Sequence, residues 1–250
     1  MHSKSKKRLD EELVDRGFYA SRARARDAIA RGCVSVGDAG AAKPSRMVAS
    51  STKISINDPA SQYVSRAALK LKHALEVTGF SPKEKTAVDL GASTGGFCQI
   101  LLEGGARQIF AVDVGHGQLV EKIANHPNVT NLENLNAREL SSEHLNGIFP
   151  DFITSDMSFI SLKLALPPAL KLAANGAFGI FLVKPQFEAG KDNLGRDGIV
   201  KDQELVTKIA EDMEEWLNNV EGWRATHLVE SPLKGGDGNK EFLLAGCKNG

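Results

Sequence analysis

The pattern of apolar and polar residues divides the chain into two regions. In residues 6–57, two amphipathic stretches with helical spacing precede two short β-like runs. Ser21 can cap the second helix, and Gly17 and Gly32 can end the two helices. This region is therefore predicted to be a small α+β domain. The second helix is expected to project its arginines into solvent, namely Arg22, Arg24, Arg26 and Arg31.

From Tyr63 onward, the pattern changes to alternating helix and strand signals. An amphipathic helix is expected over 63–80, with Leu69 and Leu75 turned inward. Apolar, β-branched strands then alternate with helices, and two adjacent strands follow at the end, which predicts a seven-stranded, mostly parallel sheet with an antiparallel edge hairpin. The predicted strands are 86–90, 108–114, 128–133, 151–156, 178–184, 223–231 and 241–247, and the predicted helices lie near 95–105, 116–125, 137–145, 160–174 and 203–219.

Composition and charge fit a globular protein with a basic amino-terminal part. Of the 250 residues, 42% are hydrophobic and 25% are charged. Residues 1–60 hold 12 Lys and Arg against 7 Asp and Glu, whereas the remainder holds 19 against 24. A basic head suits a polyanionic partner, although a solvated charged helix face would give the same excess. With a turn signal at Asp58-Pro59, we expect domains at 1–58 and 65–250, joined by a linker at 59–64.

Several classes of protein are disfavoured by what the chain contains. The three cysteines, Cys33, Cys98 and Cys247, lack CxxC spacing, which argues against a disulfide framework and fits a reducing compartment. The six histidines form no metal-ligand cluster, so no metal is expected. The charged beginning of the chain lacks the apolar core of a secretory signal, and no run approaches the ~20 apolar residues that span a bilayer. We therefore expect a cytoplasmic protein without a membrane partner.

A glycine-rich turn carries the strongest local signal. In VDLGASTGGF, a strand is followed by Gly91, Gly95 and Gly96 and then by a helix, an arrangement that lets backbone amides approach a ligand. Asp113 follows 22 residues after Gly91, where a carboxylate can accept hydrogen bonds from both ribose hydroxyls. The GxxxGG spacing disfavours a dinucleotide, and Asp89 suits a positively charged ligand such as the amino group of a methionine moiety. The alternative is a purely structural turn.

Two polar residues end predicted strands and are candidates for catalysis. Asp156 ends the fourth strand and Lys184 ends the fifth, at the sheet edge where open α/β proteins bind ligands. A buried ammonium needs a partner, and Asp156 could supply it. Such a lysine could help methyl transfer to a hydroxyl, as a base or by stabilising the developing oxyanion. A surface lysine at a strand exit is the alternative.

The segment that follows Lys184 interrupts the α/β alternation. Residues 185–202 combine several glycines with basic residues, among them Lys191 and Arg196, which suit phosphate groups. We interpret the segment as a substrate-side loop beside the site, although an ordinary solvated loop would have a similar composition.

Taken over residues 6–247, the chain resembles the TlyA, or hemolysin A, family of ribosomal RNA 2′-O-methyltransferases. The amino-terminal part resembles the alpha-L RNA-binding module of the ribosomal S-four type through RLDEELVDRGFYASRARARDAIARGCVSV. The remainder resembles FtsJ-like methyltransferases through VDLGASTGGF, VDVGHGQL, LNARELS, SDMSFISL, LVKPQFEAGKDNLGRDGIV and NKEFLLAG. The resemblance implies a Rossmann-like class I methyltransferase domain that uses S-adenosylmethionine.

The resemblance also implies roles for individual residues. It implies a catalytic tetrad of Lys70, Asp156, Lys184 and Glu241, in which Lys184 is central, Asp156 orients it, and the other two position the ribose. The cofactor-binding candidates are Asp89, Gly91, Ser93, Gly95, Gly96, Phe97, Asp113 and Asn136, although Asn136 could simply shape a turn. The RNA-binding candidates are Lys7, Arg8, Arg22, Arg24, Arg26, Lys191 and Arg196.

The resemblance favours ribosomal RNA or ribosomal subunits as the partner, with cytidines of 16S or 23S rRNA as targets. Three other classes of protein stay open from the sequence. A membrane-active, hemolysin-like protein would need a membrane-spanning run or a long amphipathic helix with a broad apolar face. A non-catalytic RNA-binding protein with a methyltransferase-like body would not need the glycine turn or the tetrad. A small-molecule methyltransferase would not need the basic head.

Overall fold

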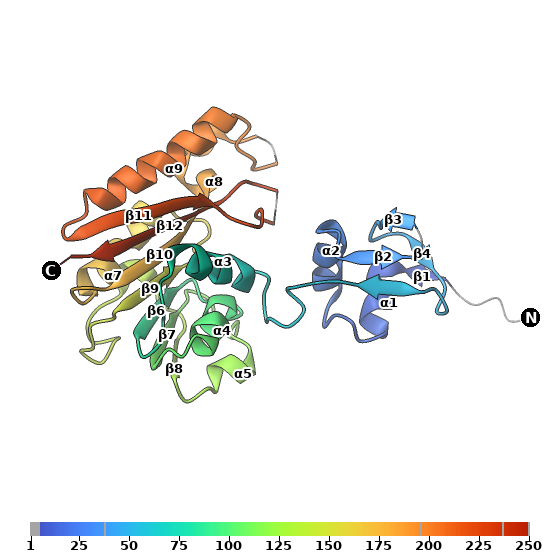
Figure 1. Ribbon diagram of the computed structural model, residues 1–250, viewed down its shortest axis with the longest axis horizontal. Helices are drawn as coiled ribbons and strands as arrows, with labels where there is room; N and C mark the ends of the chain where they lie inside the picture. Colours follow the sequence, from blue (N-terminus) through green and yellow to red (C-terminus); the bar gives the residue numbers. More distant parts are fainter. Residues whose placement is uncertain (1–5, 38, 196, 237, 250) are drawn as a thin grey trace, which may run out of the picture. The chain divides into compact units, whose positions relative to one another are not determined.

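The computed structural model describes residues 6–37, 39–195, 197–236 and 238–249, and it divides into two compact units between Gln62 and Tyr63 (Figure 1). The smaller unit contains two helices, a three-stranded sheet with the order β3-β2-β5, and a two-stranded ribbon formed by β1 and β4. Its elements are β1 (Lys7–Arg8), α1 (Leu9–Asp15), α2 (Arg22–Ala30), β2 (Val34–Val36), β3 (Ala39–Ala41), β4 (Met47–Val48) and β5 (Ile54–Ile56).

The predicted helices of the smaller unit are confirmed, with a shorter first helix. The Ser21 side chain accepts a hydrogen bond from the backbone N–H of Arg24, so it caps α2 as expected. Leu9 and Leu13 of α1 are fully buried and pack with the buried face of α2. The first helix begins only at Leu9, because Lys7 and Arg8 pair with β4 in an antiparallel ribbon that the polar sequence did not predict.

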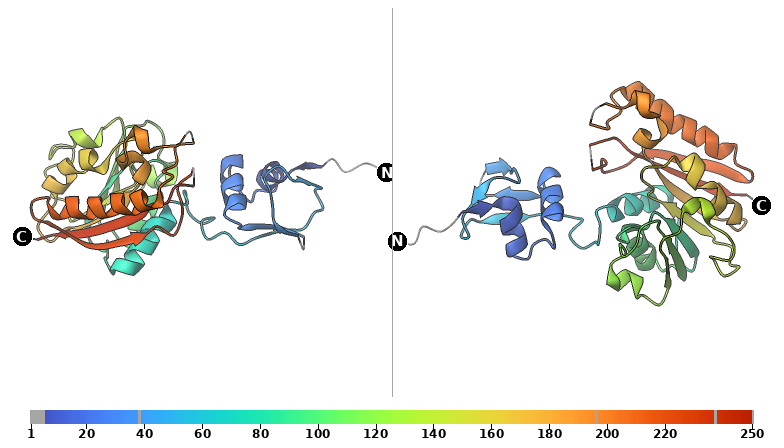
Figure 2. Two further views of the ribbon diagram at one scale, coloured as in Figure 1. Left: turned by 90° about the horizontal axis from the view of Figure 1, so that it is seen from above. Right: turned by 180° about the vertical axis from the view of Figure 1, so that it is seen from behind.

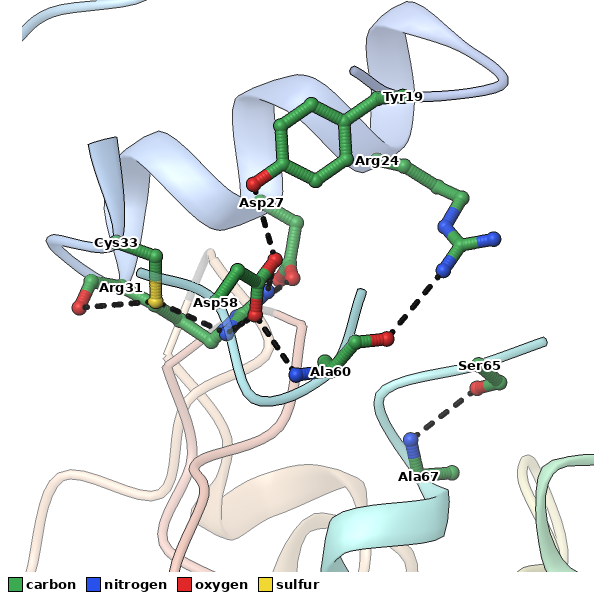
Figure 3. A network of polar contacts seen from close by, with 9 residues as sticks. All are labelled: Tyr19, Arg24, Asp27, Arg31, Cys33, Asp58, Ala60, Ser65 and Ala67. Atoms are coloured by element: carbon green, nitrogen blue, oxygen red, sulfur yellow. Dashed lines mark hydrogen bonds and ion pairs between the residues drawn. The ribbon is translucent and has the colours of Figure 1, made fainter. Parts of the chain in front are cut away.

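One arginine of this unit turns inward, contrary to expectation. The Arg31 side chain is only 14% exposed, and its guanidinium donates to both carboxylate oxygens of Asp58, at 2.8 and 3.0 Å. Asp58 also accepts hydrogen bonds from the Tyr19 hydroxyl and the Ala60 N–H (Figure 3). Burial by itself would raise the pKa of Asp58, but the hydrogen bonds from Arg31 and Ala60 hold it below its ordinary value. The segment after β5 is thereby tied back to its own unit.

The larger unit is built on one mixed sheet of seven strands in the order β11-β12-β10-β9-β6-β7-β8. The strands from β10 to β8 run parallel, β12 pairs antiparallel with β10, and β11 forms the edge antiparallel to β12. This confirms the predicted mostly parallel sheet with an antiparallel edge hairpin. The strands are β6 (Thr86–Leu90), β7 (Gln108–Val112), β8 (Val129–Leu132), β9 (Phe152–Ser155), β10 (Phe178–Val183), β11 (Trp223–Glu230) and β12 (Phe242–Lys248).

Helices cover both faces of this sheet. They are needed on both faces because successive side chains of each strand point alternately into two apolar cores. In β10, Phe181 belongs to the core beneath α6, α7 and α9, whereas Ile180 belongs to the core beneath α3, α4 and α5. In Figure 2, α3 (teal) and α9 (orange) lie on opposite sides of the strands. The helices are α3 (Ala68–Thr78), α4 (Gly96–Glu103), α5 (Glu121–Ala124), α6 (Leu162–Ala165), α7 (Pro167–Leu172), α8 (Pro185–Glu188) and α9 (Gln203–Asn218).

Four predicted helices differ from those observed. The helix expected near 116–125 is reduced to the short α5, because Gly117 has a φ of +64°, outside the helical range. The helix expected near 160–174 is split into α6 and α7, because Pro167 lacks the N–H needed to continue α6 and instead starts a new helix. The stretch near 137–145 contains only a 3₁₀ turn, η1 (Ala137–Glu139). In α3, Leu69 and Leu75 are only partly buried, because the helix is rotated so that Lys70 and Leu71 face the interior.

The Asp58–Arg31 pair yields a stability prediction. Replacing Asp58 with Ala should lower the free energy of unfolding of the smaller unit by about 3 kcal/mol, because Arg31 would lose its main partner in a largely buried place. Asp15→Ala is the matched control, since the Lys7–Asp15 pair is about half exposed and should contribute little to stability. Hydrogen exchange of peptides from residues 6–62 measures both, and equal losses in the two variants would contradict the prediction.

Candidate functional site

The glycine turn lies at the carboxyl end of β6, where it is pressed against the loop after β9. Gly91 has a φ of +77°, and a Cβ added there would lie 2.9 Å from the main-chain oxygen of Asp156. Gly96, at the start of α4, leaves room for Ser65, since an added Cβ would be 3.0 Å from the Ser65 Cβ. No side chain larger than hydrogen fits at Gly91 without displacing main chain, so the close approach of the two loops depends on this glycine.

Asp113 connects this turn to the end of β7. One carboxylate oxygen accepts from the Ser93 N–H and the other from the Gly115 N–H, each at 2.7 Å. Ser93 itself has a φ of +47°, an uncommon conformation for a residue with a side chain. The 22-residue spacing after Gly91 predicted a place for Asp113 beside the glycine turn, and the structure brings the two together. The oxygens of Asp113 retain lone pairs that could accept from a ribose.

Two neighbouring cavities open at this edge of the sheet. The larger has a volume of about 520 Å³, and the smaller, of about 140 Å³, shares with it the residues Gly91, Ser93, Asp156 and Ser158. The larger cavity combines the Asp113 carboxylate with apolar walls, a lining suited to a nucleoside. Its further lining residues are Val112, Val114, Gln118, Leu135, Asn136, Ala137, Met157, Phe159 and Ile160.

Several cofactor candidates take different positions around these cavities. Asn136 lines the larger cavity and also caps η1, accepting from the Arg138 N–H at 3.1 Å. Gly96 and Phe97 line the smaller cavity, whereas Gly95 caps α4 and lines neither of the two. The apolar walls, Val114, Leu135 and Met157, were not predicted, because their only sequence signal is that they follow strands.

Asp89 is placed beneath the turn and lines neither cavity. Its carboxylate is fully buried and accepts from the Thr154 hydroxyl at 2.8 Å and from the Cys98 thiol at 3.1 Å. Burial raises its pKa to about 6, against the lowering effect of these two hydrogen bonds. The expectation that Asp89 directly contacts a positively charged ligand does not fit this placement, because both oxygens are used inside the protein.

The four residues of the implied tetrad form two ion pairs, one buried and one mostly buried. Lys184 Nζ lies 2.6 Å from Asp156 Oδ1 and donates to the Ser158 hydroxyl at 2.9 Å. Lys70 Nζ, on α3, lies 2.6 Å from Glu241 Oε2, and both side chains are buried. In each pair, the carboxylate compensates the charge of the lysine ammonium, which would be costly to remove from water alone. Ser158 was not predicted, since a serine after a strand gives no distinctive signal.

The antiparallel β12 explains why the two pairs share one edge. Val183 of β10 is paired with Phe242 of β12, so the next step of the same register sets Lys184 opposite Glu241. The start of an antiparallel strand lies at the edge where its parallel neighbours end. Glu241 therefore reaches the edge occupied by Asp156 and Lys184, although it precedes its strand.

The RNA-binding candidates of the smaller unit are largely engaged in ion pairs. Arg8 and Arg22 both contact Asp10, which is fully buried, and Lys7 pairs with Asp15. Arg24 donates to a main-chain oxygen, whereas Arg26 is exposed. In the larger unit, Arg196 and the side chain of Lys191 lie outside the described residues.

In the parts of the chain that the structure describes, no helix has the length and apolarity needed to cross a membrane. The same residues contain no cluster of three or more His, Cys, Asp or Glu side chains arranged to hold a metal ion.

The sheet order, the glycine turn after β6 and the acidic residue after β7 together define an α/β methyltransferase domain. Residues 63–248 match the family described as FtsJ-like methyltransferase, and the chain belongs to this family.

Relatives that are similar over nearly the whole chain carry two kinds of name. The 16S/23S rRNA (cytidine-2′-O)-methyltransferase TlyA of Mycobacterium tuberculosis is 40% identical and is matched over 95% of this chain and 88% of its own. Hemolysin A of Brachyspira hyodysenteriae is 38% identical, over 94% of this chain and 98% of its own. A solved structure from Streptococcus thermophilus, described as a candidate hemolysin, is 35% identical and superposes with a TM-score of 0.76, over 99% of this chain and 90% of its own.

The raised pKa of Asp89 predicts a pH dependence of stability. Between pH 3.8 and about 6 the folded protein keeps a proton on Asp89 that the unfolded chain loses, so the stability from this group is lost as pH rises through this window. Asp89→Asn cannot titrate. The difference in free energy of unfolding between the variant and the wild type should therefore move in favour of the variant by on the order of 2 kcal/mol from pH 4 to pH 7. Denaturant titrations at several pH values measure it, and a difference independent of pH would refute the prediction.

Proposed function

We propose that the protein transfers a methyl group from S-adenosylmethionine to a ribose 2′-hydroxyl of ribosomal RNA, at a cytidine, acting in the cytoplasm on rRNA or ribosomal subunits. The observation that carries this proposal is the mostly buried Lys184–Asp156 pair in a small cavity that adjoins the nucleoside-sized one. The name of the Mycobacterium tuberculosis relative supports the substrate class and the nucleotide.

The larger cavity combines a hydrogen-bond acceptor with apolar walls, a combination that suits an adenosyl group. Asp113 can accept from ribose hydroxyls, and the apolar side chains of Leu135 and Met157 can contact a purine. The turn after Gly91 offers main-chain amides close to the cavity. S-adenosylmethionine, when bound, supplies an electrophilic methyl group on a positively charged sulfur.

In this proposal, Lys184 acts on the hydroxyl that receives the methyl group. Its ammonium, held by Asp156 and Ser158, can donate a hydrogen bond to the 2′-oxygen and stabilise the negative charge that develops there. The Asp156 carboxylate beside it is an acceptor for the hydroxyl proton. Lys70 and Glu241 hold each other at the same edge, where they can hydrogen-bond the ribose and fix its orientation.

Replacement of Lys184 tests this proposal. Lys184→Ala should reduce methyl transfer to ribosomal RNA by a factor on the order of 1,000, because it removes the donor to the reacting oxygen, and it should weaken cofactor binding far less than it slows transfer. Labelling of ribosomal subunits with methyl-tritiated cofactor measures the first, and calorimetry measures the second. Lys171→Ala, an exposed lysine of α7, is the control and should retain full activity. Full activity of the Lys184 variant would overturn the assignment.

RNA binding by the smaller unit should depend strongly on salt. If its basic residues contact phosphates, affinity will fall steeply as salt rises, and Arg26→Ala will reduce the slope of the logarithm of affinity against the logarithm of salt by about one. Arg16→Ala is the control, because Arg16 pairs with Glu12 and donates to main-chain oxygens within its own unit. Fluorescence anisotropy with labelled rRNA at several salt concentrations measures both. Affinity that does not change with salt would exclude phosphate contacts.

A further inference from the structure

Two loops carry the groups around Lys184, and one further side chain joins their far ends. The β9 loop (residues 156–161) follows β9, and the β10 loop (residues 184–188) consists of Lys184 and α8. Their near ends meet through Lys184, which contacts Asp156 and Ser158. Their far ends meet through Glu188, whose two carboxylate oxygens accept from the Ser161 hydroxyl and from the Leu162 N–H, the latter at 2.8 Å.

The β9 loop is strained between these two fastenings. Phe159 has a φ of +65°, in the left-handed region that an aromatic residue rarely adopts. Such a conformation persists only where the surrounding structure holds it on both sides. On one side of Phe159, Ser158 is bound by Lys184, and on the other side, Ser161 is bound by Glu188. Loss of the Glu188 contacts would leave the carboxyl end of the loop free to relax.

A relaxed loop would disturb both cavities. Met157 and Ile160 line the larger cavity, and Asp156 and Ser158 line both. The main-chain oxygen of Asp156 also lies against Gly91, so a shift of the loop would be transmitted to the glycine turn. The position of the far end of the β9 loop therefore bears on cofactor binding and on the alignment of Asp156 with Lys184.

We propose that Glu188 is a positioning residue that fixes the β9 loop against the β10 loop through its hydrogen bonds to Ser161 and Leu162. The inference rests on the proposed function for its effect on methyl transfer. Glu188 acts by geometry and needs no negative charge. A glutamine at this place can accept from the Leu162 N–H with its oxygen and donate to the Ser161 hydroxyl with its amide.

The difference between two substitutions tests the inference. Glu188→Ala should reduce kcat for methyl transfer by on the order of 100-fold. The same variant should weaken binding of S-adenosylhomocysteine by about tenfold. Glu188→Gln should stay within a few-fold of the wild type in both measurements. Glu211→Ala, on the exposed face of α9, is the matched control and should change neither.

Hydrogen exchange of peptides that cover residues 156–165 gives a direct readout of the loop. Exchange should be faster in Glu188→Ala and close to wild type in Glu188→Gln. Ser161→Ala removes one of the two contacts of Glu188 and also the cap that Ser161 provides for the Lys163 N–H of α6. Its effect is therefore read at residues 156–160, where a smaller increase in exchange is expected, and this increase tests the inference if Glu188→Ala does not fold. Equal defects in the Gln and Ala variants, or unchanged exchange in Glu188→Ala or Ser161→Ala, would overturn the inference.

Cofactor binding and hydrogen exchange require no RNA, so the two proposals can fail separately. If wild-type protein did not methylate rRNA but the variants followed the expected order in these two measurements, the substrate would be wrong and the positioning role would stand. If the wild type methylated rRNA and the variants did not follow this order, the positioning role would be wrong.

Discussion

Two lysine ammonium groups are held almost out of solvent at one edge of the sheet, and the larger unit is arranged around that constraint. An ammonium removed from water is strongly destabilised unless a carboxylate lies beside it. Lys70 has Glu241 and Lys184 has Asp156, each at 2.6 Å, so the four charges form two neutral pairs. A site of this kind keeps charge available for chemistry without leaving an uncompensated charge in the interior.

The topology brings these groups together, and the loops refine their positions. The parallel strands end at one edge of the sheet, and the antiparallel β12 starts at the same edge. Left-handed backbone at Ser93 and Phe159 occurs in the loops that line the cavities. Strained conformations of this kind are concentrated at functional sites because the surrounding contacts hold them. The regular sheet thus supplies most of the packed core, and the irregular loops set the positions of the side chains that line the cavities.

The sequence predicted the elements whose signal is local. The apolar strands, the glycine turn and the cap at Ser21 follow from propensity and periodicity, and all appear in the structure. The inward rotation of Lys70 could not be predicted from α3 alone, because its cause is Glu241, which lies 171 residues away. The burial of Arg31 similarly depends on Asp58. The strands β1 and β4 could not be predicted from hydrophobic periodicity, because two residues are too few to show a period.

The place of β12 in the sheet has a consequence for the order of folding. The ribosome synthesises Lys70 early and Glu241 late, yet the first needs the second as its counter-ion. Until β12 inserts between β10 and β11, the nascent domain lacks an interior strand and the partner of Lys70. Such a long-range contact forms slowly because a large loop must close first. The site is therefore complete only after β12 has been synthesised and has paired with β10.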